Sequence, residues 1–408
     1  MAMKQTQTKL IDFSDVGLDF SVGSKNLFPD RFKKILSLGY NVQTVSSVAI
    51  AGNQITLTYG GAHGYRADRI IKVDSGPLAS INGGEFWIDS VTTNTVTMTI
   101  DDAPLIAAGG ITTRIAPLGW SLEYENENIH IYKLKALDES DLFIRLCFQN
   151  NPSYRNRIAP CVGRTADLIA GTITDEYALS ETKGIATPGS FAWEFTREAN
   201  STFNNYTAAQ GSAFGKSYIV GSLYHLALFA NTTVDTAYSG CGLVNALLPF
   251  HGLDYDAIKL PVLMGQTYSV ATGEGRIRTL DNAAMYVGNI SARIQASPTG
   301  DAGDSIVSHV PFARSSFLPV EIDSFNTTTC WPVPIYQKPT CQFLGYVYGI
   351  FLVSYATSGA PGTAKTNIPL ITKDIDLNSN VVVHQIEWNS LGGGVWFAAP
   401  VEEVKIGA

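Results

Sequence analysis

The stretch from Val42 to Ile100 constrains the fold most, because apolar residues recur in it at every second position. Such alternation turns one side of a β-strand inward and the other towards water, so it predicts short antiparallel strands. Asn82-Gly83-Gly84 and Thr93-Asn94 separate the runs with residues that favour chain reversal. We expect a compact β-barrel or β-sandwich of about five strands. The alternating apolar residues are Ile55, Leu57, Tyr59, Ile70, Ile71, Val73, Phe86, Ile88, Val91, Val96, Met98 and Ile100.

Two glycines are candidates for structural turns in this stretch. Gly64 lies in the tight connection from Gly60 to Tyr65, and Gly83 lies in the Asn-Gly turn. At both positions we expect a positive φ or a close approach of the backbone, which only glycine permits without strain. Alanine at either position should cost about 1 kcal/mol or more.

The same region carries a resemblance. Ala62-His63-Gly64-Tyr65, Ile81-Asn82-Gly83, Phe86 and Val91 to Val96 are similar, in kind and order, to a module of tailed-bacteriophage virion proteins. Those proteins follow the module with a Gly-Trp segment and longer β segments, including a strand-turn-strand hairpin. The resemblance implies a structural protein of the virion. The matching later segments are Gly119-Trp120, Phe143 to Leu146, Tyr218 to Gly221 and Tyr224 to Leu226.

Composition is typical of a folded, β-rich protein with several domains. The chain has 408 residues, of which 45% are hydrophobic and only 16% charged, and its formal net charge is −8. An acidic chain without a run of Lys and Arg is a poor partner for nucleic acid. The N-terminal segment has no uninterrupted apolar core, so we expect synthesis in the cytoplasm and no membrane partner. The resemblance implies that the cytoplasm is that of a host bacterium and that the protein's final location is the virion. The five cysteines are scattered and are expected to be free thiols, with a Cys330–Cys341 bridge as the open alternative.

Four regions follow along the chain. Residues 1–40 are expected to form an extended N-terminal arm, which would reach a neighbouring subunit or remain a partly ordered terminus, and a short amphipathic helix over Pro29–Leu36. Residues 41–118 form the small β-barrel or β-sandwich domain, 119–250 a second β domain, and 251–408 a C-terminal β domain with a long irregular excursion over 296–342. Long polar loops are expected at 150–158 and 200–215. Strands are expected at 129–134, 142–148, 191–195, 218–220, 223–229, 267–270, 284–287, 343–355, 381–388 and 395–397.

Motifs that would carry chemistry are few. Gly211 to Ser217 resembles a phosphate loop but has three residues between its glycines where the loop needs four, and Gly273-Glu274-Gly275 lacks the third glycine of a dinucleotide site. Hydrolysis of a glycan needs two carboxylates at a set separation, which sequence cannot show. The candidate acids are Asp101-Asp102 and Asp138, Glu139, Asp141. We interpret them instead as solvated residues of polar turns. The six histidines lack the short spacing of a local metal site, although distant loops could still assemble one. We therefore predict no catalytic, cofactor-binding or metal-binding residue, and no enzyme activity.

Aromatic residues in the predicted loops are the best interface candidates, because aromatic side chains give a large contact area at a low entropic cost. Packing onto their own domain is the alternative for each. Together these features favour a non-enzymatic virion component of the tail, baseplate or neck that forms a cyclic homo-oligomer and binds other virion proteins through its arm and loops. The alternatives are a capsid decoration protein and a carbohydrate-binding or depolymerising receptor-binding protein. The candidate interface residues are Tyr154, Phe203, Tyr206, Trp331 and Tyr336.

Overall fold

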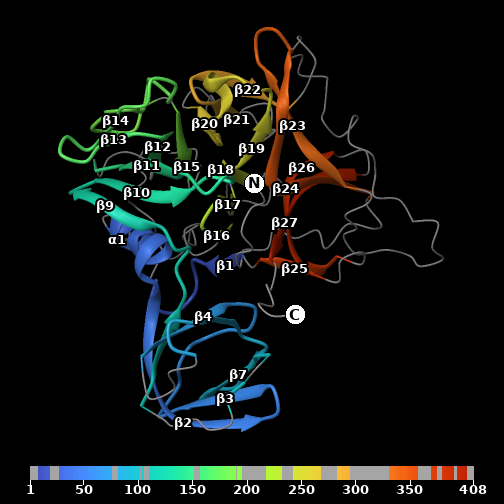
Figure 1. The fold of residues 1–408 in the computed structure, drawn as a ribbon. Coiled ribbons are helices and arrows are strands. Elements are labelled where there is room, and N and C mark those ends of the chain that lie inside the picture. Colours follow the sequence, from blue (N-terminus) through green and yellow to red (C-terminus); the bar gives the residue numbers. More distant parts are fainter. Residues whose placement is uncertain are drawn as a thin grey trace, which may run out of the picture.

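The structure is a computed structural model, and its fold is mainly β, as predicted (Figure 1). Strand pairing is antiparallel throughout the described part, which contains one short α-helix, α1 (Phe28–Lys33). The strands form a small sheet, a two-stranded ribbon and a large branched sheet. The structure describes residues 8–18, 27–75, 81–101, 103–104, 110–150, 157–189, 191–194, 217–231, 242–267, 283–294, 330–356, 369–374, 379–389 and 393–401.

The small sheet holds the stretch with the strongest alternation. It has seven strands where about five were expected, in the order β5-β4-β8-β2-β3-β7-β6. The long strand β2 pairs with β8 through its first half and with β3 through its second, with a register shift in each pairing. One bent strand therefore serves both halves of the sheet. The strands are β2 (Tyr40–Ala51), β3 (Gln54–Tyr59), β4 (Ile70–Ser75), β5 (Glu85–Trp87), β6 (Ser90–Val91), β7 (Thr95–Thr99) and β8 (Thr112–Ile115).

The predicted alternation holds within this sheet. In β3 the side chains of Ile55, Leu57 and Tyr59 are buried, and in β7 those of Val96 and Met98 are buried, while the threonines between them are not. Burying an aliphatic side chain contributes about 1.5–3 kcal/mol. These positions consequently fix the register, since a slip of one residue would turn the apolar set towards water.

The large sheet links eighteen of the described strands, and its pairings branch. Residue 250 is the predicted boundary between the second β domain and the C-terminal one, and strands on its two sides pair directly, as β18 does with β20. The four domain ranges stay a prediction. The ribbon is β13 (Ala166–Asp167) with β14 (Thr172–Ile173). The strands of the large sheet are β1 (Lys9–Asp12), β9 (Ser121–Asn126), β10 (Ile129–Lys135), β11 (Asp141–Phe148), β12 (Arg157–Gly163), β15 (Phe191–Glu194), β16 (Tyr218–Gly221), β17 (Leu226–Asn231), β18 (Gly242–Leu248), β19 (Phe250–Gly252), β20 (Val262–Thr267), β21 (Ala283–Val287), β22 (Ile290–Arg293), β23 (Trp331–Gln337), β24 (Phe343–Ala356), β25 (Leu370–Lys373), β26 (Asn380–Asn389) and β27 (Gly393–Val401).

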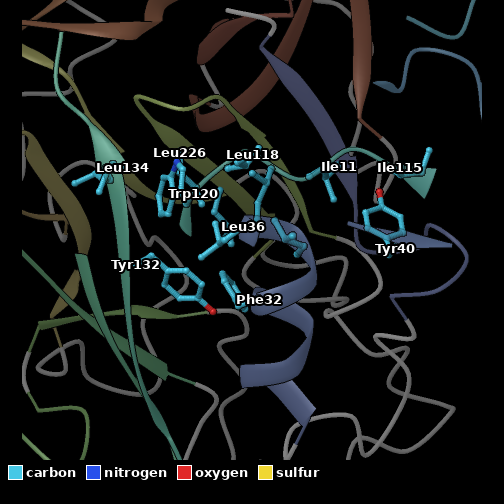
Figure 2. Close-up of a cluster of buried hydrophobic side chains, with 14 of the residues drawn as sticks. Ile11, Phe32, Leu36, Tyr40, Ile115, Leu118, Trp120, Tyr132, Leu134 and Leu226 are labelled. Atoms are coloured by element: carbon cyan, nitrogen blue, oxygen red, sulfur yellow. The ribbon is translucent and has the colours of Figure 1, made fainter. Parts of the chain in front are cut away.

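The predicted amphipathic helix is confirmed and lies between the small sheet and the large one. Helix α1 continues as a π-helical turn, η2 (Lys34–Leu38), and buries Phe32, Ile35 and Leu36. Figure 2 shows Phe32 and Leu36 beside Trp120 and Tyr132, within a cluster that also takes in residues of β1, β8 and β17. One continuous core therefore connects the helix with both sheets. A further short helix, the 3-10 turn η6 (Asp256–Ile258), follows β19.

The N-terminal segment does not form the predicted arm over residues 8–18, which is a correction. Strand β1 pairs with β16 of the same chain, and Leu10, Ile11 and Phe13 are buried. The buried Lys9 donates to the carbonyl of Pro117 and pairs with Glu85, so this segment ties the large sheet to the small one. The difference arises because burial of its apolar residues in the chain's own core is more favourable than their exposure to water. Residues 1–7 and 19–26 lie outside the described part.

Several of the described strands lie where sequence patterns predicted none, and three of them are informative. Strand β23 occupies part of the predicted irregular excursion. It contains Pro332 and Pro334, which pair with β24 on one side. On the other side β22 pairs only with the last two residues of β23, so in the described part both prolines have a single neighbouring strand, where proline is tolerated. Strand β12 begins inside the predicted loop 150–158, and β18 was not predicted at all. Two predicted strands are displaced: that at 223–229 forms as β17, and that at 267–270 meets the structure only at Thr267, the last residue of β20.

The cysteine prediction can be followed for the four described residues, Cys147, Cys161, Cys330 and Cys341. None of the four forms a disulfide, so the alternative of a Cys330–Cys341 bridge is wrong. Cys147 and Cys161 are buried, and burial raises the pKa of the Cys161 thiol to about 11. Cys241 lies outside the described residues.

Candidate functional site

The His63 motif is a structural latch of the small sheet. The Nδ1 atom of buried His63 accepts the backbone N–H of Tyr65 at 2.9 Å, and its Nε2 lies 3.0 and 3.1 Å from the carbonyl oxygens of Thr92 and Thr95. These contacts suit the neutral ring with its proton on Nε2. The loop after β3 is thereby fastened to the turn before β7. Both ring nitrogens are occupied, so this arrangement holds the fold and leaves no free base.

The two turn glycines lie in loops of the same sheet. Gly64 has a φ of +72° and Gly83 a φ of +76°. A Cβ on Gly64 would come within 2.9 Å of Val16 Cγ2, whereas nothing lies within 4 Å of a Cβ on Gly83. The backbone conformation thus favours glycine at both positions, and at Gly64 close packing adds to it.

A buried ion cluster joins the N-terminal segment to the small sheet. The guanidinium of Arg69 donates from Nε to Asp15 at 2.9 Å and from Nη2 at 3.2 Å, and the Tyr40 hydroxyl donates to the same carboxylate at 2.8 Å. Asp12 lies 3.7 Å from Arg69, and burial raises its pKa against the opposing hydrogen bonds from Ser14. Every one of these contacts is internal, so the cluster stabilises the junction.

The acids singled out in the sequence serve a turn and surface pairs. Asp138 accepts the hydroxyl and the backbone N–H of Ser140, which lowers its pKa. Asp141 pairs with Lys135 at 2.5 Å, and Glu139 accepts the hydroxyl of Tyr224 at 2.6 Å. Asp101 is described and Asp102 is not. Within the described ranges no group of three His, Cys, Asp or Glu residues could hold a metal ion.

The histidines divide into buried and exposed ones. His130, His225 and His384 are buried, and burial lowers the pKa of His130 and of His225 to about 4. A ring with so low a pKa stays neutral at pH 7. His251 on β19 is exposed, and His309 lies outside the described residues.

Strands β19, β23 and β24 pair side by side (Figure 1). Aromatic side chains gather on their exposed side, which we call the aromatic face. Its rings form two linked pairs: the ring centroid of Phe343 lies 5.6 Å from that of Tyr336 and 5.0 Å from that of Tyr346. His251 and Tyr348 form a further pair at 6.4 Å. The face consists of His251, Pro334, Tyr336, Phe343, Tyr346 and Tyr348.

Strand register brings these residues together. Tyr346 in β24 lies opposite His251 in β19 on one side and opposite Pro334 in β23 on the other. Opposed residues of an antiparallel pair share a side of the sheet, so the three side chains form one row. On the reverse side Val347 and Ile335 are buried in the core. The rings consequently stand on a rigid support.

The exposure of this face is unusual for the molecule. Phe343, Tyr346 and Tyr348 expose 37%, 44% and 49% of their area, and Tyr255, just beyond β19, exposes 64%. With Trp331, these are all of the large aromatic residues that are exposed in the described ranges. The strands β19, β23 and β24 also contain no Asp, Glu, Lys or Arg. Exposed apolar patches are typical of interaction surfaces, so this face is the candidate interface.

The sequence-predicted interface residues meet this face only in part. Tyr336 belongs to it, and Trp331 lies at the start of β23 with 41% of its area exposed. Tyr154, Phe203 and Tyr206 lie outside the described residues, as do Gly211 to Lys216 and Gly273 to Gly275. Sequence reasoning missed Phe343, Tyr346, Tyr348 and His251, although tyrosines two residues apart on a strand were an available signal.

Comparisons with known proteins give no family. No protein-family model matches the chain, and no curated protein matches it. A search of solved structures finds a similarity to a phage phi92 endosialidase, with 12% identity, a TM-score of 0.14, and coverage of 90% of this chain and 52% of that one. The chain spans about half the length of that structure, and a TM-score of this size supports no conclusion. Among the described residues, no helix is long and apolar enough to cross a membrane.

Proposed function

We propose that this chain is a non-enzymatic structural component of a tailed-phage virion, in the tail, baseplate or neck, that forms a symmetric oligomer and binds neighbouring virion proteins. The aromatic face is the observation that carries the proposal. Tyr, Trp and Phe are enriched and charged residues depleted at the centres of protein–protein interfaces, and this face has both properties. The resemblance of residues 42–120 to a virion module supplies the setting.

The remaining features support a structural role. His63, the Asp15–Arg69 pair and the acids at 138–141 are all engaged in holding turns and sheets together. The continuous core around helix α1 ties the two sheets into a stiff unit. A component that holds neighbours in place gains from such stiffness, because less entropy is lost on binding.

Binding of carbohydrate by a receptor-binding protein is the second candidate, and the same face favours it. Exposed aromatic rings also suit sugar rings, since each offers an apolar body, and the tyrosines add a polar hydroxyl. The structural role is preferred because the face is a broad sheet surface without charged groups at its centre. Capsid decoration is a variant of the structural role in another part of the particle.

Quantitative mass spectrometry of purified particles tests the proposal. We expect this chain at a fixed copy number relative to the other virion proteins, as symmetric assembly requires. Its absence from the particles would overturn the proposal. Incubation of the purified chain with surface polysaccharide of the host, followed by measurement of reducing ends, supplies a second arm, in which cleavage would contradict the non-enzymatic role.

A further inference from the structure

The area and the charge of the aromatic face restrict which partner can cover it. With about 200 Å² for a fully exposed aromatic side chain, Phe343, Tyr346 and Tyr348 of this face present roughly 260 Å². A standard interface buries about 800 Å² on each partner. The face is thus large enough to be the centre of such an interface.

Charge favours one occupant over the others. The whole chain has a net charge of −8, so two copies repel each other over most of their surfaces. Strands β19, β23 and β24 have no Asp, Glu, Lys or Arg, and a contact made through them brings the least of that repulsion. An acidic or basic partner would find no matching charge there.

We infer that a second copy of this chain binds to the aromatic face, with the two faces in contact across a two-fold axis. This inference rests on the proposed homo-oligomer and names its contact surface. A two-fold contact places the same patch on both subunits, so aromatic rings meet aromatic rings and neutral strands meet neutral strands. Rings that stand on a rigid sheet lose little entropy when they are covered, which suits central contact residues.

A pair of charged variants tests the contact. The double variants Tyr346→Lys/Tyr348→Lys and Tyr346→Glu/Tyr348→Glu place like charges on both faces of a dimer. In sedimentation velocity over a concentration series, we expect the unaltered full-length chain to dimerise and each double variant to raise the dimer dissociation constant by about 30-fold or more, as expected for the loss of a central aromatic contact. An equimolar mixture of the Lys and Glu variants should restore dimers.

Controls separate the other occupants. Ile169, which is 95% exposed in the turn between β13 and β14, supplies the matched control Ile169→Lys, which should dimerise like the unaltered chain. A chain that is monomeric at every concentration overturns the inference, as does a mixture that fails to restore dimers. A fall in thermal stability of the variants that is independent of protein concentration would also overturn it, because the face would then pack within one chain.

The outcomes are distinct from those for the proposed function. A dimerising chain that is absent from particles supports the face-to-face contact and overturns the virion role. A monomeric chain that is present in particles does the reverse. Binding of host polysaccharide that both double variants abolish, without any dimer, would assign the face to glycan and overturn the inference.

Discussion

Removal of the Asp15 carboxylate should destabilise the chain more than the loss of any surface ion pair. Asp15 accepts hydrogen bonds from Arg69 and from the Tyr40 hydroxyl, and the side chain of Arg69 is only 5% exposed. In Asp15→Ala the guanidinium stays buried, with Asp12 at 3.7 Å as its remaining counter-ion. Breaking a buried pair costs about 3–5 kcal/mol, and the nearby Asp12 places the expected loss near 3 kcal/mol.

The matched control lies in the same sheet. Asp74 pairs with Arg114 at 2.8 Å, but both side chains are partly exposed, so Asp74→Ala should cost less than about 1 kcal/mol. The double variant Asp15→Ala/Arg69→Met should recover part of the lost stability, because it removes the unpaired charge. Urea unfolding of the full chain, followed by tryptophan fluorescence and circular dichroism, measures all three. Equal losses for Asp15→Ala and Asp74→Ala would refute the reasoning.

Gly64→Ala should cost more than Gly83→Ala, which itself should cost about 1 kcal/mol, because only the former also clashes with Val16; equal melting temperatures would contradict this. Burial lowers the pKa of His225 from its ordinary 6.5 to about 4, so the folded state binds fewer protons than the unfolded state. The free energy of unfolding should therefore fall as the pH drops from about 6.5 to 4. His225→Gln should remove about 3 kcal/mol of that pH dependence, and a variant with the same pH profile as the unaltered chain would contradict this prediction. Calorimetry should detect no ATP binding, and micromolar binding that Lys216→Ala abolishes would reverse the interpretation of the incomplete phosphate loop.

The alternation of apolar and polar residues predicted the strands correctly where one side of a strand faces solvent. Strands β3 and β7 have this pattern, and their buried residues were predicted. Strand β12 has every residue buried, so the alternation is lost, and it was missed. Strand β23 contains two prolines, which favour irregular structure in a prediction from sequence. Among the described residues both prolines pair with β24 alone, and a strand with one such neighbour tolerates proline.

The aromatic face was harder to predict, because exposure depends on which strands cover which side. Phe343, Tyr346 and Tyr348 lie in a predicted strand, yet their sequence is compatible with either a buried or an exposed row. Tyr346 pairs with His251, which is nearly a hundred positions away in the chain, and a pairing over such a distance is not visible in the sequence. The latch around His63 was equally hidden, since its partners Thr92 and Thr95 belong to a distant turn. Sequence therefore predicted the strands that alternate clearly, but not which residues are neighbours in the fold.

Hydroxyl-radical footprinting of purified particles tests most directly whether the aromatic face is an assembly surface. The dilute chain and the particle-bound chain are oxidised in parallel, and modification of Phe343, Tyr346 and Tyr348 is measured by mass spectrometry against the exposed Ile169. The account predicts that the three rings become protected in particles while Ile169 keeps its rate. Equal oxidation of the three rings in both samples would contradict the account.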